Sequence, residues 1–148
     1  MCLAVADYII YKTNEYNKQN NSNIRMTCKR LMKLIYFCDA EYMRLQGEPK
    51  SIIKDEYYAW DSGPVLPDIY LKYVNFQNGK MFPLKDTYKN LDINITNTID
   101  SILDRTFEFS TEKLIKISHR KNSPWEKYSN KNGRIPKEEI FNYYYKIK

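Results

Sequence analysis

Hydrophobic positions along the chain recur mostly every three or four residues, the spacing of one face of an α-helix. This pattern predicts about seven helices: Leu3 to Tyr16, Thr27 to Gly47, Pro67 to about Phe76, and four more that begin at Asn94 or Thr96, Ser110, Ser123 and Pro136. Residues 52–60 are instead rich in β-branched and aromatic side chains and predict a strand that ends at Trp60. We therefore expect a mainly α (α+β) fold: one domain over residues 1–148, a compact bundle of about seven helices with a small β element near residues 52–60.

The helix that starts at Thr27 carries the longest hydrophobic stripe. Thr27 is a good N-cap, and Gly47 suits the left-handed position that follows a helix. We expect this stripe to lie in the core, and Lys29, Lys33 and Tyr36 to lie toward a solvated face. The stripe consists of Leu31, Leu34, Ile35, Cys38, Tyr42 and Leu45.

A predicted turn at residues 61–64 follows the aromatic run that ends at Trp60. Gly63 tolerates positive φ, Pro64 fixes its own φ, and Pro67 suits the first turn of the next helix. We expect this corner to be primarily a buried folding determinant, so that Trp60→Ala should cost ~3–5 kcal/mol. Its secondary interpretation is a rigid surface against which a partner docks.

Two segments connect these elements less clearly. The run of Asn and Ser at residues 17–23 predicts a loop. Residues 80–93 predict either a long loop or a second strand, and Gly79 is expected to end the helix before them.

The net charge of +6 and the pI near 9.1 are compatible with nucleic-acid or acidic protein partners. A basic nucleic-acid-binding regulator is therefore the alternative function, although its basic residues are spread along the chain rather than clustered. No hydrophobic run approaches the ~18 residues that a membrane helix needs. The N-terminus lacks the basic region of a signal peptide, and the three cysteines show no pairing pattern, so we expect a cytoplasmic protein.

The residues that commonly carry catalysis are sparse. His119 is the only histidine, and no G-x-S-x-G, P-loop or G-x-G-x-x-G motif occurs. We therefore predict no catalytic residues, cofactor or metal site, and a hydrolase built on His119 is the least favoured function. His119 is expected instead to cap the end of its helix, where a partly positive ring suits the carbonyl groups.

Three sequence blocks, in order and in register, resemble those of one known family. They are Leu31-Met32-Lys33-Leu34-Ile35-Tyr36-Phe37, similar to "LxKLLYF"; Ala59-Trp60 with Gly63-Pro64-Val65, Pro67 and Tyr70, similar to "AWxxGPVxPxxY"; and Ser118-His119 with Pro124-Trp125, similar to "[ST]HxxxxPW". Together they resemble the Panacea antitoxin domain family of SocA-like and phage-associated GepA-like proteins. Asp61-Ser62 and Lys121-Asn122 depart from the family pattern.

The resemblance implies a small helical, non-enzymatic antitoxin from a toxin–antitoxin or prophage context. Such a protein neutralises a cognate toxin by direct binding, and in one branch of the family it delivers the toxin to a protease as an adaptor. We expect the candidate partner-binding residues to be Lys33, Tyr36, Trp60 and Tyr70. The residues that we expect to determine the fold are Leu31, Leu34, Trp60, Gly63, Pro64, Pro67, His119, Pro124 and Trp125.

Overall fold

The computed structural model describes residues 2–76 and 80–147, which form seven α-helices and a three-stranded sheet. The helices are α1 (Cys2–Asn20), α2 (Cys28–Gln46), α3 (Pro67–Tyr73), α4 (Ile93–Thr106), α5 (Thr111–Ser118), α6 (Pro124–Tyr128) and α7 (Lys137–Ile147). The strands are β1 (Tyr57–Trp60), β2 (Gly63–Val65) and β3 (Arg134–Ile135). The predicted mainly α fold with a small β element is confirmed.

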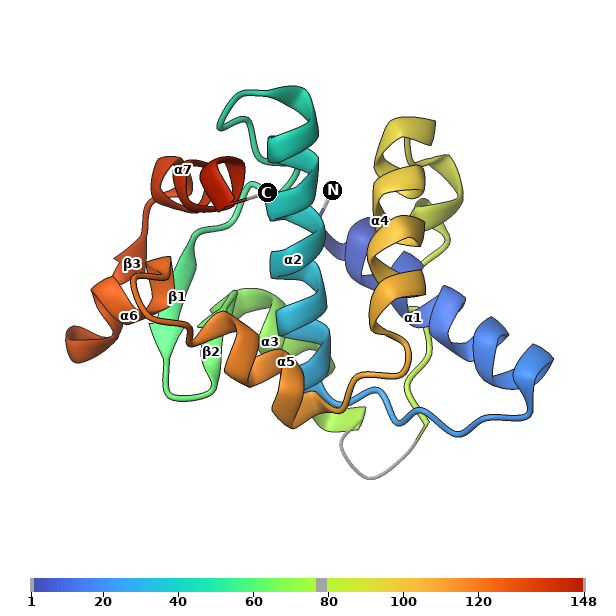
Figure 1. The fold of residues 1–148 in the computed structure, drawn as a ribbon. Coiled ribbons are helices and arrows are strands. Elements are labelled where there is room, and N and C mark those ends of the chain that lie inside the picture. The colour runs from blue at the N-terminus through green and yellow to red at the C-terminus, as the bar shows by residue number, and fades with distance from the viewer. Residues whose placement is uncertain (1, 77–79, 148) are drawn as a thin grey trace.

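Helix α2 runs through the centre of the molecule, with α1 and α4 on one side and the sheet, α6 and α7 on the other (Figure 1). All ten residues from 31 to 40 are buried, because α2 is enclosed by α1, α4, α5, α7 and β2. The solvated face predicted for this helix is therefore wrong for Lys33 and Tyr36, which are both 0% exposed. The predicted core position of Leu45 is also wrong, since this last-turn side chain is 54% exposed.

Both predicted ends of α2 are confirmed. The Thr27 side chain accepts a hydrogen bond from the backbone N–H of Arg30, and Gly47 has a left-handed φ of 75°. The start of α5 is likewise confirmed, because the Ser110 side chain accepts from the backbone N–H of Lys113. The capping residues Thr27, Gly47 and Ser110 therefore mark these boundaries in the sequence.

The sheet has the order β2-β1-β3, and both pairs are antiparallel. Trp60 pairs with Gly63, so only Asp61 and Ser62 form the hairpin loop. The predicted turn at residues 61–64 is thus too long, and the strand predicted from residue 52 begins at Tyr57. The second partner of β1 is β3, which has two residues and no sequence pattern of its own.

Two predicted helix boundaries in the N- and C-terminal halves are wrong. Helix α1 continues to Asn20, into the segment predicted as a loop. Helix α4 begins at Ile93 rather than after Asn94 or Thr96, because Asp92 is its N-cap and accepts from the backbone N–H of Asn94. Asp92 is as good a cap as either residue chosen from the sequence.

The segment at residues 80–93 contains no strand among its described residues; it is a loop with a short 3-10 helix at Thr87–Asn90, and α4 begins at its last residue. Helix α1 holds the loop in place. Asp7 accepts hydrogen bonds from the Tyr73 hydroxyl at 2.7 Å and from the backbone N–H groups of Leu84 and Lys85 at 2.9 and 3.1 Å. One buried carboxylate thus fixes this loop against two helices. The predicted helix stop at Gly79 lies outside the described residues.

Aspartate also anchors the connection between α2 and β1. Asp39 accepts hydrogen bonds from the Ser51 hydroxyl, the Ile52 backbone N–H and the Tyr57 hydroxyl at 2.5, 3.0 and 2.9 Å. The three donors satisfy a carboxylate that is 0% exposed. Burial raises its pKa, and the hydrogen bonds from Ser51, Ile52 and Tyr57 oppose that rise.

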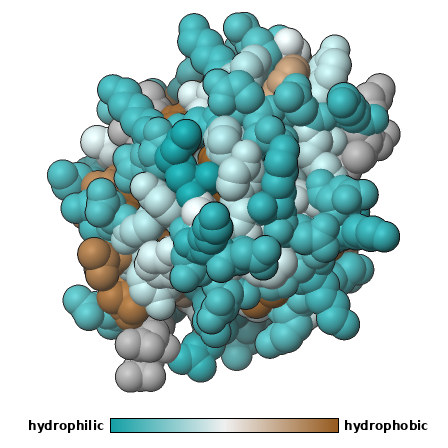
Figure 2. Space-filling model, turned by 90° about the vertical axis from the view of Figure 1, so that its left-hand side faces the viewer, coloured by the Kyte–Doolittle hydropathy of each residue, from teal (hydrophilic) through white to brown (hydrophobic). Residues whose placement is uncertain are grey.

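The surface on the side of α6 and α7 is largely hydrophilic, with hydrophobic residues only in small separate patches (Figure 2). This face therefore offers no broad hydrophobic area for a partner. Within the described residues, no helix is both long and hydrophobic enough to cross a membrane.

Candidate functional site

The three sequence blocks meet at one corner of the molecule, where α2, the β1–β2 hairpin, α5 and α6 come together. Lys33, from the middle of the α2 block, lies beneath β2 and donates a hydrogen bond from Nζ to the Pro64 carbonyl at 3.3 Å. Its side chain is 0% exposed. Lysine is rarely buried so completely, which makes this residue unusual in the fold.

Gly63 explains how the hairpin approaches α2 so closely. Its φ is +115°, a conformation that L side chains rarely adopt. A Cβ atom at this position would lie 2.5 Å from Lys33 Cε and 2.8 Å from Ser118 Oγ. Glycine is therefore needed both for the backbone conformation and for the close contact of β2 with α2 and α5.

His119 and Trp125 join the third block to the hairpin. Their rings stack with centroids 3.6 Å apart and planes 9° from parallel. Trp125 Nε1 donates to the backbone carbonyl of Trp60 at 2.6 Å. His119 occupies the C-cap position of α5, where its backbone N–H donates to the Ile115 carbonyl at 3.1 Å, but its ring stacks on Trp125 and makes no capping bond among the described residues. Burial and the nearby Lys33 lower the pKa of the ring, which opposes the partial charge expected for it.

The predicted start of α6 at Ser123 is confirmed. The Ser123 hydroxyl accepts from the backbone N–H of Glu126 at 3.3 Å, and Pro124 occupies the first turn. In a capping box the residue at the Glu126 position bonds back to the N–H of the capping serine, but here the Glu126 carboxylate accepts from the backbone N–H of Asn122 at 2.7 Å. This short capped helix places Trp125 against His119.

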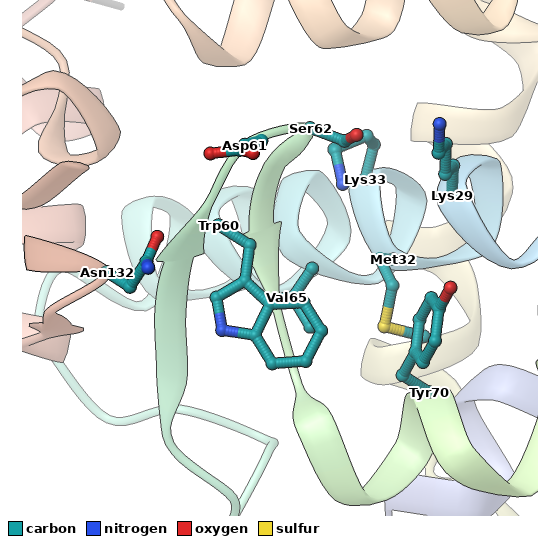
Figure 3. A pocket seen from close by; sticks show the side chains of 9 residues that line it. All are labelled: Lys29, Met32, Lys33, Trp60, Asp61, Ser62, Val65, Tyr70 and Asn132. Atoms are coloured by element: carbon teal, nitrogen blue, oxygen red, sulfur yellow. The ribbon is translucent and has the colours of Figure 1, made fainter.

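A pocket of about 300 Å³ opens beside this corner. Trp60 and Tyr70 contribute an edge-to-face aromatic pair with ring centroids 5.9 Å apart. Both side chains are half-buried, so each presents part of its surface to solvent. The pocket is lined by Lys29, Met32, Lys33, Trp60, Asp61, Ser62, Val65, Tyr70 and Asn132 (Figure 3).

Electrostatically, Lys33 is the unusual group of the pocket. Burial lowers its pKa from 10.5 to about 7, and the positive charge of Lys29 contributes to the lowering. Among the described residues, Lys33 forms no ion pair with a carboxylate. The amine is therefore held with the Pro64 carbonyl as its one hydrogen-bond partner in the described structure.

Other reactive side chains nearby are not arranged for nucleophilic catalysis. The Ser118 hydroxyl donates to the Ile115 carbonyl at 2.7 Å rather than to His119, and His119 Nε2 has no hydrogen-bond partner among the described residues. Burial raises the pKa of Cys28 to about 11, which disfavours its thiolate. In the part of the chain that the structure describes, no cluster of His, Cys, Asp and Glu could hold a metal ion.

Three of the four predicted partner-binding residues, Lys33, Trp60 and Tyr70, line the same pocket. The fourth, Tyr36, lies apart in the core, where its ring packs edge-to-face against Tyr57 at 5.5 Å. Asn132 of the pocket wall was not predicted, because nothing in its local sequence relates it to the hairpin.

Comparison with known proteins places most of the chain in one family. Residues 31–126 match the family model described as "Antitoxin SocA-like, Panacea domain". The chain is also 27% identical over 116 residues to Antitoxin SocA from Caulobacter vibrioides (strain NA1000 / CB15N), an alignment that covers 70% of this chain and 60% of that protein. The chain thus spans about 60% of the length of this curated relative. No solved structure matches.

Proposed function

Because the chain belongs to the SocA-like Panacea antitoxin domain family, we propose that it neutralises a cognate protein toxin by binding it directly. The observation that carries the proposal is the match over residues 31–126, which includes α2 from Leu31 onward, the hairpin, α5 and the start of α6. These elements meet at the corner beside the Lys33 pocket, called the pocket corner below. An antitoxin acts by occupying its partner, a function that requires a binding surface and no catalytic residues.

The pocket corner is the surface that we assign to the toxin. Trp60 and Tyr70 are large, half-buried and fixed against each other, so they lose little side-chain freedom on binding. Aromatic side chains with these properties are typical anchors of protein interfaces. Helix α7 carries another aromatic pair, Phe141 and Tyr145, with ring centroids 4.9 Å apart, but neither of these residues lines the pocket beside Lys33.

Co-expression tests the function itself. Genes adjacent to the coding gene are expressed singly and together with it, and growth is followed. We expect one neighbouring product to arrest growth, the present protein to restore it, and the two proteins to co-purify. Absence of a toxic neighbour that this protein can bind would overturn the proposal.

Substitution then tests the surface. Tyr70→Ala should weaken co-purification and rescue, because it removes one half of the aromatic pair while Val65 and Met32 still line the pocket floor. Tyr145→Ala is the matched control, since Tyr145 is a 50% exposed aromatic on α7. Equal rescue by both variants, with unchanged melting temperatures, would place the toxin elsewhere.

The fate of the bound toxin separates occlusion from delivery to a protease. We propose occlusion as the main activity and treat the adaptor role as its extension. A chase of labelled toxin, with and without this protein, measures the difference. An unchanged toxin half-life during rescue supports occlusion, whereas a half-life shortened only in the presence of this protein establishes the adaptor role.

A further inference from the structure

We propose that the pocket beside Lys33 receives an acidic side chain of the partner protein, whose carboxylate becomes the ion partner of the Lys33 amine. This inference rests on the proposed antitoxin function and names the chemistry that the toxin must present. It gives a specific chemistry, a buried ion pair, to Lys33, which is among the partner-binding residues expected from the sequence.

The first observation is the lack of local compensation for Lys33. A buried cation is normally paired with a carboxylate or surrounded by several acceptors. Lys33 has the Pro64 carbonyl at 3.3 Å and no ion pair within the described structure. An ammonium has three N–H donors, so two are without an acceptor. Because the side chain is 0% exposed, the proposal requires the amine to turn from the Pro64 carbonyl into the pocket when the carboxylate arrives.

The second observation is the position of the pocket. Lys33 contributes to its wall together with Lys29, which lies one helical turn earlier on α2 and is exposed (Figure 3). Two basic side chains on one wall favour an anion. The opposite walls are hydrophobic, from Trp60, Val65 and Tyr70, so they suit the methylene groups that carry a carboxylate in Asp and Glu.

The third observation is charge complementarity. The chain carries a net charge of +6, which favours an acidic partner over a basic one. Asp61, on the exposed hairpin loop, is the one carboxyl among the residues that line the pocket, and it forms no ion pair with Lys33. A free acidic residue of the partner would supply the missing charge.

The test compares Lys33→Met with Lys29→Met in binding to the purified toxin identified by co-expression, measured by titration calorimetry. Methionine preserves most of the buried side-chain volume while removing the charge. We expect Lys33→Met to weaken binding at least tenfold and Lys29→Met to weaken it about two- to threefold, because an exposed charge is screened by solvent. Circular dichroism melts establish that both variants are folded.

A double-mutant cycle identifies the partner's residue. Each Asp and Glu on the toxin surface is changed to its amide, and each variant is titrated against the wild type and Lys33→Met. We expect one amide substitution to weaken binding to the wild type at least tenfold and to have less than a twofold effect on Lys33→Met. Coupling of this kind identifies the carboxylate that faces Lys33.

Proton linkage gives a further readout. Because a carboxylate stabilises the charged amine, binding should weaken as the pH rises from 7 to 8.5, while binding by Lys33→Met should change less. The other charged or titratable groups around Lys33 are Lys29 and Cys28 on α2, His119 at the end of α5, Asp61 on the hairpin and Tyr70 on α3. They are present in both proteins, so the difference between the two profiles reports Lys33.

The outcomes separate the two proposals. A wild-type protein that binds no toxin overturns the proposed function and the present inference with it. A wild-type protein that binds the toxin, with Lys33→Met binding within twofold of it, leaves the antitoxin function standing and overturns the carboxylate site. Weaker binding by a folded Lys33→Met, without coupling to any acidic residue of the toxin, also overturns it.

Discussion

Asp39 and Lys33 are two buried ionisable groups on the same helix, α2, but they differ in how many hydrogen bonds the fold gives them. Asp39 receives three hydrogen bonds, from Ser51, Ile52 and Tyr57, at 2.5–3.0 Å. Lys33 donates a single one, to the Pro64 carbonyl at 3.3 Å. Both are 0% exposed, so the two groups differ in the number of hydrogen bonds that offset the loss of water and not in burial.

This contrast separates a structural role from a binding role. The donors around Asp39 come from the chain that follows α2, so its carboxylate fixes the path from the helix to β1. Lys33 holds no loop or strand in this way. Burial lowers its pKa to about 7, so the fold disfavours its charged form. A group that destabilises the free protein and faces a pocket is a candidate for function.

The largest effect is expected for Asp39→Ala. The substitution leaves the Ser51 hydroxyl, the Ile52 N–H and the Tyr57 hydroxyl without their common acceptor, and each unmade bond to a charged group is costly. We expect a loss of ~3–5 kcal/mol in the free energy of unfolding, measured by urea denaturation. Asp104→Ala, at an exposed position on α4, is the control and should change little. A loss below ~1 kcal/mol for Asp39→Ala would contradict its anchoring role.

The next largest effect is expected at Gly63, where the hairpin packs against Lys33. Gly63→Ala places a methyl group 2.5 Å from Lys33 Cε at a φ of +115°, so strain and overpacking combine and should cost ~2–4 kcal/mol. Gly47→Ala is the matched control: its φ is also positive, at +75°, but no atom lies within 4 Å of the added carbon. We expect ~1 kcal/mol there. Equal losses in thermal melts would show that the hairpin does not press on Lys33.

A smaller effect is expected for Trp60→Ala. From the sequence alone, burial of this ring predicts a loss of ~3–5 kcal/mol. Its side chain is only half-buried and lines the pocket, so we now expect ~1–3 kcal/mol together with a clear loss of toxin binding. Chemical denaturation beside a pull-down separates the two effects. A loss of ~3–5 kcal/mol in the free energy of unfolding would instead identify Trp60 as a folding determinant.

Much of the fold could be predicted because its signals are local. The hydrophobic stripe and the caps at Thr27 and Gly47 define α2, and Ser110 and Ser123 start two later helices. The motif residues of the site were also found by pattern, although the pattern said nothing about how they meet.

The remaining features depend on contacts between distant parts of the chain. Lysine is usually exposed, and nothing near Lys33 in the sequence shows that a hairpin formed by residues 57–65 will cover it. Strand β3 has only two residues, too few for an alternating pattern. Asp7 interrupts a hydrophobic segment, and nothing near it in the sequence indicates that it is buried, because its three donors come from residues 73–85.

The central claim is that Lys33 is a buried amine without a compensating charge in the free protein. The most direct test is the free energy of unfolding of the wild type and of Lys33→Met from pH 6 to 9 at constant ionic strength. The folded-state pKa, about 7, lies below that of the unfolded chain, so the unfolded state binds more protons above pH 7. We predict that the wild type gains stability relative to Lys33→Met as the pH rises above 7, approaching ~1.4 kcal/mol per pH unit. A difference between the two proteins that stays constant from pH 6 to 9 would contradict the claim.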